Sequence, residues 1–363
     1  MTPLGRRLAA LIRAQGPIPV GLYMSECLAD PEHGYYMRRD PLGADGDFTT
    51  APEISQMFGE LIGLWCADVW QRMGAPDPVV LLELGPGRGT LMADVVRAAG
   101  AVPAFRAALD VHLVEISPAL RARQEQVLAA VGATWHDRLE EVPDGPTLVV
   151  ANEFFDALPV RQFVRTGRGW RERLVDVDPA AGDDRLCFAL APEPAPEAVF
   201  GDREPGGDEG AVIELRPAGE ALAGELARRL AGHGGAALII DYGPAESGVG
   251  DSLQAVRGHA FHPVLDDPGE CDLTAHVDFA ALARAARRAG AAVHGPVTQG
   301  AFLARLGIAT RAAMLAAGNA ARRREVEAAV RRLTAPDAMG ELFKVMALAD
   351  PALPAPAGFE AHP

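Results

Sequence analysis

The stretch that decides the fold is VVLLELGPGRGT, residues 79–90. An apolar run, broken only by Glu83, leads directly into three glycines, Gly85, Gly87 and Gly89. A buried strand followed by a glycine-rich turn and a helical pattern is typical of the first strand of a parallel sheet, where the turn holds a cofactor. The stretch therefore predicts a ligand site at the end of this strand.

The chain beyond this turn alternates between short apolar runs and helical stretches. Runs that read as strands are VHLVE (residues 111–115), TLVVAN (147–152), AALIIDYG (236–243) and ELFKVMAL (341–348). Strands that alternate with helices form right-handed crossovers and a parallel sheet. The sequence therefore predicts an α/β protein with a doubly wound, mostly parallel sheet.

Two segments interrupt this pattern. Residues 1–75 read as a helical N-terminal segment, with one long amphipathic helix from Ala51 to Met73 and Thr50 and Glu53 at the spacing of a capping box. Residues 76–363 read as the main domain, with an inserted α+β segment at about 165–235 that contains a Pro-, Gly- and acid-rich loop.

Composition excludes several classes of function. The 34 basic and 49 acidic residues give a formal charge of −15, which argues against a nucleic-acid partner. The four cysteines form no CxxC pair, so we predict neither disulfides nor a metal site, and a cytoplasmic location. No apolar run of about 18 residues is present, so we predict no membrane insertion. The oligomeric state is left open.

Glu83 identifies the cofactor. Its carboxylate, at the lip of the glycine turn, would repel a pyrophosphate and attract an ammonium group. The glycines are also spaced more tightly than in the dinucleotide fingerprint. S-adenosylmethionine carries an ammonium and a sulfonium but no phosphate, so we predict that it binds at Gly85, Gly87 and Gly89.

Two further acids complete the predicted cofactor site. Glu115 ends the second strand, where an acid can accept hydrogen bonds from ribose hydroxyls, or is simply a surface acid. In WHDR, residues 135–138, Asp137 is a candidate for the adenine amino group and Trp135 for packing on the ring. Ordinary packing and solvation explain Trp135 and Asp137 equally well.

The predicted chemistry lies in ANEFFDALPV, residues 151–160. Asn152, Glu153 and Asp156 follow a strand beside the first one, at the edge where ligands bind in such sheets. Two carboxylates beside a methyl donor favour a cationic nucleophile such as an arginine guanidinium. Glu153 is the first candidate and Asp156 the second. Asp156 also fits a helix cap, and Asn152 a turn former.

Six segments together resemble one known family: GDFTTAPEISQMFGELIGLW, ELGPGRGTL, NEFFDALPV, IIDYG, DLTAHVDF and MGELFKVMAL. They resemble the MidA-like S-adenosylmethionine-dependent methyltransferases, whose mitochondrial member is an assembly factor for respiratory complex I. The resemblance covers nearly the whole chain and is weakest from about Thr166 to Leu230.

The resemblance implies a seven-stranded Rossmann-like class I methyltransferase sheet and symmetric dimethylation of an arginine in a complex I core subunit. It also implies that residues 46–56 lie across the pocket, so that Thr50, Glu53 and Gln56 would bind the protein substrate. For Glu53 the capping box is a competing explanation. Three alternatives remain open: a non-catalytic assembly scaffold that binds the cofactor, a small-molecule methyltransferase, and an NAD-dependent oxidoreductase.

Overall fold

The central feature of the fold is a sheet of seven strands. The computed structural model describes residues 1–38, 49–180, 185–201, 206–317 and 320–360. Neighbouring strands pair in parallel from β10 to β4, whereas β15 runs antiparallel to both β10 and β14. In spatial order the strands are β14 (Ala292–Thr298), β15 (Phe343–Ala349), β10 (Gly235–Tyr242), β5 (Thr147–Asn152), β2 (Val79–Leu84), β3 (Leu109–Val114) and β4 (Thr134–His136). The predicted mostly parallel, seven-stranded sheet is confirmed.

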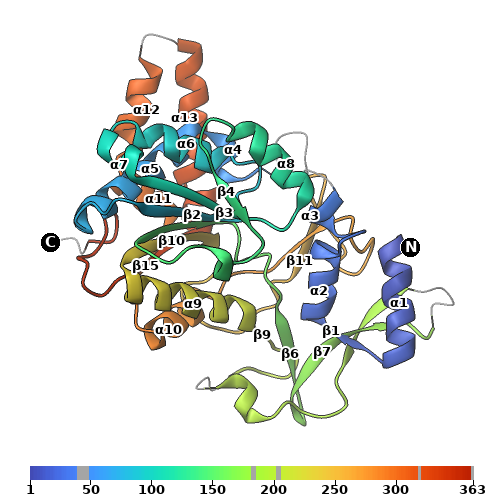
Figure 1. Ribbon diagram of the computed structural model, residues 1–363. Coiled ribbons are helices and arrows are strands. Elements are labelled where there is room, and N and C mark those ends of the chain that lie inside the picture. The colour runs from blue at the N-terminus through green and yellow to red at the C-terminus, as the bar shows by residue number, and fades with distance from the viewer. Residues whose placement is uncertain (39–48, 181–184, 202–205, 318–319, 361–363) are drawn as a thin grey trace.

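Both faces of this sheet are buried. Along β2, Val79 and Leu81 contribute to one hydrophobic core and Val80 and Leu82 to another, as the pleat of a strand requires. Parallel sheets covered on both faces read as continuous apolar runs, which is why residues 79–82 lack alternation. The first core contains residues of α5 (Gln56–Arg72), α6 (Thr90–Ala99), α7 (Pro103–Ala108) and α11 (Gln299–Arg305), and the second those of α9 (Pro217–His233) and α10 (Phe279–Arg288) (Figure 1).

A second, antiparallel sheet joins the N-terminal part of the chain to its middle. Ile18 and Pro19 of β1 pair with Val175 and Leu174 of β7, so segments far apart in the sequence share this sheet. Its strands are β1 (Ile18–Pro19), β7 (Gly169–Val177), β6 (Arg161–Thr166) and β9 (Val212–Leu215), with β8 (Leu186–Leu190) on β7. A third sheet holds β12 (Ala260–His262), β11 (Gln254–Arg257) and β13 (Asp272–Thr274).

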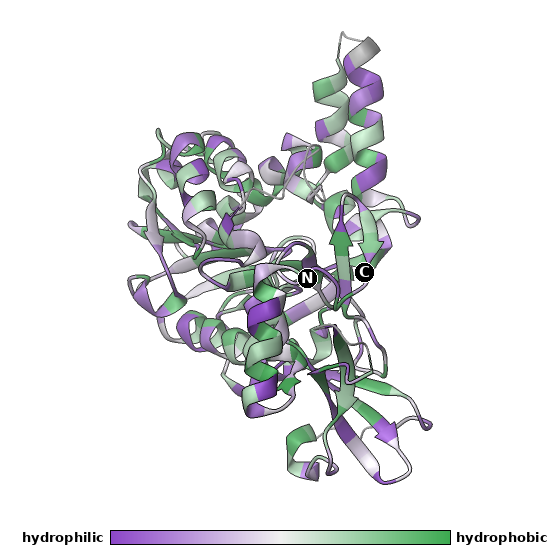
Figure 2. Cartoon of the chain, turned by 90° about the vertical axis from the view of Figure 1, so that its right-hand side faces the viewer, coloured by the Kyte–Doolittle hydropathy of each residue, from purple (hydrophilic) through white to green (hydrophobic). Residues whose placement is uncertain are grey.

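The remaining helices lie around these sheets. Two of them, α12 and α13, project together away from the body (Figures 1 and 2). Among the described residues, no helix combines the length and hydropathy that crossing a bilayer requires. The bounds are α1 (Pro3–Gln15), α2 (Val20–Ala29), α3 (Tyr35–Arg38), α4 (Ala51–Ile54), α8 (Pro118–Val127), α12 (Ile308–Ala316), α13 (Ala320–Thr334), α14 (Met339–Leu342) and the 3₁₀ turns η1 (Leu139–Glu141) and η2 (Glu197–Phe200).

The single long helix predicted from Ala51 to Met73 is wrong. Ser55 adopts an extended conformation, with φ −164° and ψ 136°, and separates the short α4 from α5. The Ser55 hydroxyl accepts the Met57 N–H at 3.2 Å and so caps α5. The Thr50 side chain makes no capping hydrogen bond, so the predicted capping box is also wrong. The break frees the Glu53 side chain to reach other partners.

Candidate functional site

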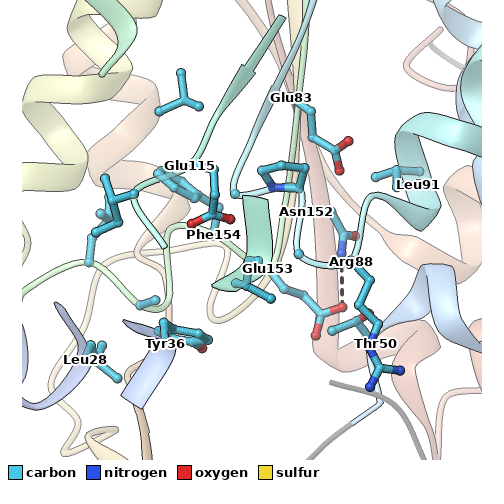
Figure 3. A pocket seen from close by; sticks show the side chains of 18 of the residues that line it. Leu28, Tyr36, Thr50, Glu83, Arg88, Leu91, Glu115, Asn152, Glu153 and Phe154 are labelled. Carbon is cyan, nitrogen blue, oxygen red and sulfur yellow. Dashed lines mark hydrogen bonds between the residues drawn. The ribbon is translucent and has the colours of Figure 1, made fainter. Parts of the chain in front are cut away.

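A cavity of about 340 Å³ opens at the carboxyl ends of β2, β3 and β5 (Figure 3). This is the edge at which ligands bind in open α/β sheets. Its wall is assembled from three loops that follow these strands, together with α2, α3 and α4. Nine of the twelve predicted site residues line this cavity: Glu83, Gly85, Gly87, Glu115, Asp137, Asn152, Glu153, Thr50 and Glu53. A tenth, Gly89, begins the helix behind it.

The glycine turn after β2 depends on left-handed backbone conformations. Gly85, Gly87 and Gly89 have φ values of 62°, 52° and 82°, which residues with a side chain rarely adopt. A Cβ atom on Gly85 would also come within 2.6 Å of the Phe154 ring. Gly89 is the N-cap of α6, so the turn presents the free N–H groups of a helix start to the cavity.

Glu83 brings an unsatisfied carboxylate to this cavity. It is only 3% exposed, and its Oε2 atom has no hydrogen-bond partner among the described residues. Burial raises the pKa of Glu83 to about 8, and the nearby charge of Glu115 adds to this, while the Met92 N–H acts in the opposite direction. A buried acceptor without a donor is destabilising unless a ligand supplies one. An ammonium group fits this requirement.

Glu115 lies at the end of β3 with both oxygens oriented by the protein. Its Oε1 atom accepts the Ser117 N–H at 2.8 Å, and its Oε2 atom accepts the Gln124 side chain at 3.0 Å. Burial raises its pKa, and these two donors oppose the effect. The Ile116 N–H is a third donor to this carboxylate, which has about four acceptor positions, so Glu115 can accept a further hydrogen bond from a diol.

Gln124 is a residue that sequence reasoning missed. Its side-chain nitrogen also donates to the Gly87 carbonyl at 2.7 Å, and its oxygen accepts the Trp135 indole N–H at 2.8 Å. It therefore connects the glycine turn, Glu115 and β4. A glutamine inside α8 carries no sequence signal for this role, because the contact depends on how α8 packs across the sheet edge.

Of the two residues predicted to contact an adenine ring, one lines the cavity and the other does not. Asp137 lines the cavity, and its carboxylate accepts an Arg121 N–H at 2.5 Å. Trp135 is not among the lining residues, so its expected packing on the ring is wrong, because its indole is engaged with Gln124. Ile116 lines the cavity instead and is 50% exposed, which offers an apolar surface to a planar base.

Glu153 occupies a conformation that is unfavourable for a residue with a side chain. Its φ is 51°, and its N–H is held by the Ile240 carbonyl of β10 at 2.8 Å. Strained backbone of this kind occurs at functional sites where the surroundings enforce it. The Oε1 atom accepts the Ala51 N–H at 3.1 Å. It also accepts the Asn152 side chain at 3.1 Å (Figure 3). Burial, followed by the charge of Asp156, raises its pKa to about 7.

Asp156 does not face the cavity, so its predicted place at the reactive end is wrong. The backbone turns after Phe154, and the Asp156 carboxyl instead lies against Tyr242. Burial raises its pKa to about 6, and its contact with Tyr242 lowers it. It starts no helix, so the alternative of a helix cap is also wrong.

Asp241 holds this turn in place. It is completely buried, and its Oδ2 atom accepts the N–H groups of Phe155 and Asp156 at 2.9 and 3.2 Å. The turn that carries Glu153 is thus fixed to the end of β10. In the IIDYG segment, the sequence leaves a turn role and a place in the substrate pocket equally open for Asp241, and neither predicts these contacts.

The short helix α4 closes one side of the cavity. Thr50 and Glu53 line it, and Glu53 accepts the Thr90 hydroxyl at 2.5 Å and lies 3.7 Å from Arg88. These contacts tie α4 to the glycine turn and replace the predicted capping box. Gln56 does not line the cavity, because its side chain donates to Glu60 at 3.1 Å on α5. Residues 46–48 of the predicted lid lie outside the described residues.

The polar side chains that line the cavity are mostly carboxylates and hydroxyls, together with the amide of Asn152 and the guanidinium of Arg88. Among the residues that the structure describes, no three His, Cys, Asp or Glu side chains gather as metal ligands. His262 lies 3.4 Å from Asp267 as a simple pair. The site thus combines three acids with raised pKa values: Glu83 for a cation, Glu115 for a diol and Glu153 beside them.

Comparison with known proteins agrees with this geometry. A family model for S-adenosyl-L-methionine-dependent methyltransferases matches residues 61–297. A mouse relative named protein arginine methyltransferase NDUFAF7, mitochondrial, is 40% identical in sequence. The match covers 96% of this chain and 84% of the mouse protein. The human protein of the same name is 38% identical, and the match covers 96% of this chain and 83% of the human protein.

A solved structure has the same fold throughout. The crystal structure of a Burkholderia thailandensis protein bound to S-adenosyl-homocysteine superposes with a TM-score of 0.85 and 31% identity, covering 99% of this chain and 94% of that one. Its bound ligand is the demethylated form of the cofactor expected from Glu83. The prediction of S-adenosylmethionine as cofactor is confirmed at the level of the family.

The predicted cytoplasmic location is contradicted by these relatives, several of which are named as mitochondrial proteins. That prediction rested on four unpaired cysteines, which the structure describes as free thiols. Free thiols are compatible with any reducing compartment, so they could not distinguish one such compartment from another.

Proposed function

The chain belongs to the family of S-adenosylmethionine-dependent methyltransferases, and from that premise we propose that it methylates an arginine guanidinium in a protein substrate. The observation that carries the proposal is Glu153, a carboxylate with a raised pKa at the end of the strand beside the glycine turn. The names of the curated relatives as protein arginine methyltransferases support the same substrate class.

In this proposal the cofactor is held by residues of the three strand ends. Glu83 pairs with the ammonium group, Glu115 accepts the ribose hydroxyls, and Asp137 accepts the adenine amino group beside Ile116. The bound cofactor supplies a methyl group on a positively charged sulfur. A side chain at Gly85 would collide with the Phe154 ring, so the turn depends on a glycine there.

Glu153 has two proposed roles. Its oxygens orient one guanidinium nitrogen, since a carboxylate accepts two parallel N–H bonds from that group. The nitrogen forms a bond to the methyl carbon as the carbon–sulfur bond breaks, and the leaving proton passes to Glu153. A guanidinium has a pKa above about 12, so it keeps its proton until the bond forms. A carboxyl with a pKa near 7 is a better acceptor than an ordinary glutamate.

Asn152 has a positioning role in this proposal. Its side-chain nitrogen donates to Glu153 at 3.1 Å and so fixes the carboxylate that faces the substrate. Thr50 and Glu53 on α4 are proposed to contact the protein substrate, because both line the cavity. Asp156 and Gln56 are not assigned to the site, for the reasons given above.

The finer identity of the substrate rests on the resemblance alone. We propose a complex I core subunit that is symmetrically dimethylated. We also keep the proposed division into residues 1–75 and 76–363, with an insertion at about 165–235. A cofactor-binding scaffold without activity is the second candidate, favoured only by the assembly role that the resemblance implies.

The proposal predicts that Glu153→Gln abolishes methyl transfer but leaves cofactor affinity within about twofold. The change removes the proton acceptor without altering the size of the side chain, so transfer should fall at least a hundredfold, in the range for loss of a general base. Transfer is measured as labelled methyl incorporated into proteins of an extract from cells lacking the gene, and affinity by calorimetry with S-adenosyl-homocysteine.

Glu125→Gln on the exposed face of α8 is the matched control and should be fully active. Equal transfer by Glu153→Gln would refute the proposed role of that residue. If wild-type protein binds S-adenosyl-homocysteine but labels no protein, the scaffold is the better reading.

A further inference from the structure

A second cavity, of about 560 Å³, lies at the same edge of the main sheet. Its wall includes Gly243, which follows β10, and Lys344 near the start of the antiparallel β15. Because β10 is the immediate neighbour of β5, the cavity lies one to two strand spacings, about 5–10 Å, along the edge from the loop that carries Glu153. Cofactor binding, which we propose for the first cavity, does not involve this second cavity.

Arg216 forms the polar floor of this second cavity. It is 3% exposed, and Nη2 lies 3.3 Å from the Glu214 carboxylate, but its Nη1 atom has no hydrogen-bond partner among the described residues. An unsatisfied buried donor costs about 1–3 kcal/mol, so the floor lacks an acceptor that a ligand could provide.

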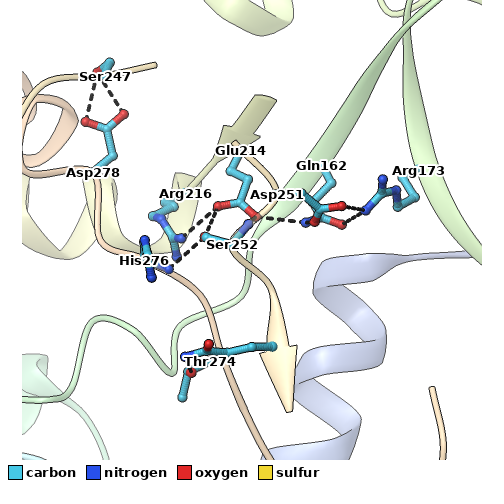
Figure 4. A network of polar contacts seen from close by, with 11 residues as sticks. Gln162, Arg173, Glu214, Arg216, Ser247, Asp251, Ser252, Thr274, His276 and Asp278 are labelled. Carbon is cyan, nitrogen blue, oxygen red and sulfur yellow. Dashed lines mark hydrogen bonds and ion pairs between the residues drawn. The ribbon is translucent and has the colours of Figure 1, made fainter. Parts of the chain in front are cut away.

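Two acids near Arg216 are already engaged with other donors. Glu214 accepts the Ser252 N–H at 3.0 Å and the Gln162 side chain at 2.8 Å. Asp278 accepts the Ser247 hydroxyl and the Ala281 N–H, each at 2.8 Å. Figure 4 shows Glu214 joined to Arg216, Ser252 and Gln162, with Asp278 and Ser247 as a separate pair nearby. Arg216 Nη1 is left without an acceptor among the described residues.

The mouth of the cavity has a different chemistry. Val249 and Leu342 line it, and about half of each side chain is exposed. Glu246 and Glu341 also line it. These carboxylates, with Glu214 and Asp278, disfavour a polyanion such as nucleic acid because like charges repel. An apolar mouth above a buried donor without a partner in the described part of the chain suits a polypeptide, which offers aliphatic side chains and acceptor oxygens.

One wall connects the two cavities. The Tyr242 hydroxyl interacts with Asp156, in the turn that carries Glu153, and the Tyr242 ring lies 5.6 Å from the His276 ring, which lines the second cavity. A polypeptide that presents an arginine to Glu153 would therefore continue past this wall toward Arg216.

We propose that the second cavity binds the polypeptide segment adjoining the methylated arginine, with Arg216 Nη1 donating to one of its acceptor oxygens and Val249 and Leu342 packing against an aliphatic side chain. This inference rests on the proposed function. The acceptor is either a main-chain carbonyl or an acidic side chain, because both present an oxygen that can accept a hydrogen bond from Arg216.

The test alters the mouth of the cavity, where the fold is least at risk. Leu342→Arg and Val249→Arg should each raise the extract concentration for half-maximal methyl transfer at least tenfold. The saturating rate and the affinity for S-adenosyl-homocysteine should stay within twofold. Phe261→Arg is the matched control, because Phe261 is apolar, exposed and outside both cavities, and should leave all three values unchanged.

A second pair of variants identifies the acceptor. If the acceptor is an acidic side chain, Leu342→Glu should weaken substrate binding more than Leu342→Gln does. If the acceptor is a main-chain carbonyl, the two variants should have equal effects. If Leu342→Arg and Val249→Arg reach half-maximal methyl transfer at the same extract concentration as the wild type, the inference is overturned and the proposed function remains intact. If the wild type labels no protein, the proposed function and this inference fail together.

Discussion

Glu83 is the residue whose environment most directly explains the choice of ligand. A carboxylate in this position has to be buried to meet the cofactor. Burial raises its pKa to about 8 although the Met92 N–H opposes this, and its Oε2 atom has no partner among the described residues. The free protein therefore carries a destabilised group that a bound ammonium would satisfy. Stability is sacrificed for recognition here, as is common at functional sites.

This predicts a pH-dependent instability of the cofactor-free protein. The folded-state pKa of Glu83 lies above its ordinary value of 4.5, so its contribution to stability is present below pH 4.5 and is lost as pH rises through about 8. Glu83→Gln should therefore raise the free energy of unfolding more at pH 8.5 than at pH 5. Denaturant unfolding at both pH values measures this.

The same variant should bind S-adenosyl-homocysteine at least tenfold more weakly, because the ammonium loses its charged partner. Glu125→Gln serves as the control for both measurements. An equal stability change at the two pH values would show that Glu83 is not buried as described.

Glu153 predicts the pH dependence of the reaction. Its pKa is raised to about 7, and only the ionised form can accept a proton. The value of kcat/KM should therefore rise with pH through about 7 and level off above it. The profile is measured with saturating cofactor and limiting protein substrate. A profile that is flat from pH 6 to 8 would contradict the assignment of Glu153 as proton acceptor.

At the scale of elements, the contact between α5 and α6 explains how the glycine turn is supported. A Cβ atom on Gly63 of α5 would lie 2.7 Å from the Val95 carbonyl and 2.9 Å from Ala98 Cβ, both on α6. The two helices therefore pack closely only because Gly63 has no side chain. Since α6 begins at the turn, its position sets that of the cofactor site.

Gly63→Leu should destabilise the protein by about 1–3 kcal/mol through overpacking and weaken cofactor binding by displacing α6. Leu64→Ala, at an exposed position of the same helix, should change stability by less than about 0.5 kcal/mol. Chemical unfolding and calorimetry with S-adenosyl-homocysteine measure the two effects. Wild-type stability in Gly63→Leu would contradict the close packing of α5 on α6.

For the whole molecule, the sequence predicted the main sheet and much of the site because both depend on local signals. Apolar runs, the glycine turn and acids at strand ends are visible in residues 79–90, 111–115 and 147–153. The site residues that follow these strands meet because the ends of parallel strands share one edge. The position of each such residue was therefore fixed once the sheet was known.

The errors share a different cause. Asp156 and Gln56 turn away from the cavity because their side chains find partners, Tyr242 and Glu60, that are distant in the sequence or on the next helical turn. Gln124 was missed, and the contacts of Asp241 were not foreseen, for the same reason, because both depend on packing between elements. The pairing of β1 with β7 was equally invisible, because two residues of an edge strand carry no periodicity.

The central claim, that this site methylates arginine in a protein, is tested most directly by locating the transferred group. Purified enzyme is incubated with deuterated-methyl S-adenosylmethionine and an extract from cells lacking the gene, and the proteins are analysed by mass spectrometry. The account predicts deuterated methyl groups on arginine side chains, and none with Glu153→Gln. Label found only on other amino acids or on small molecules would contradict it.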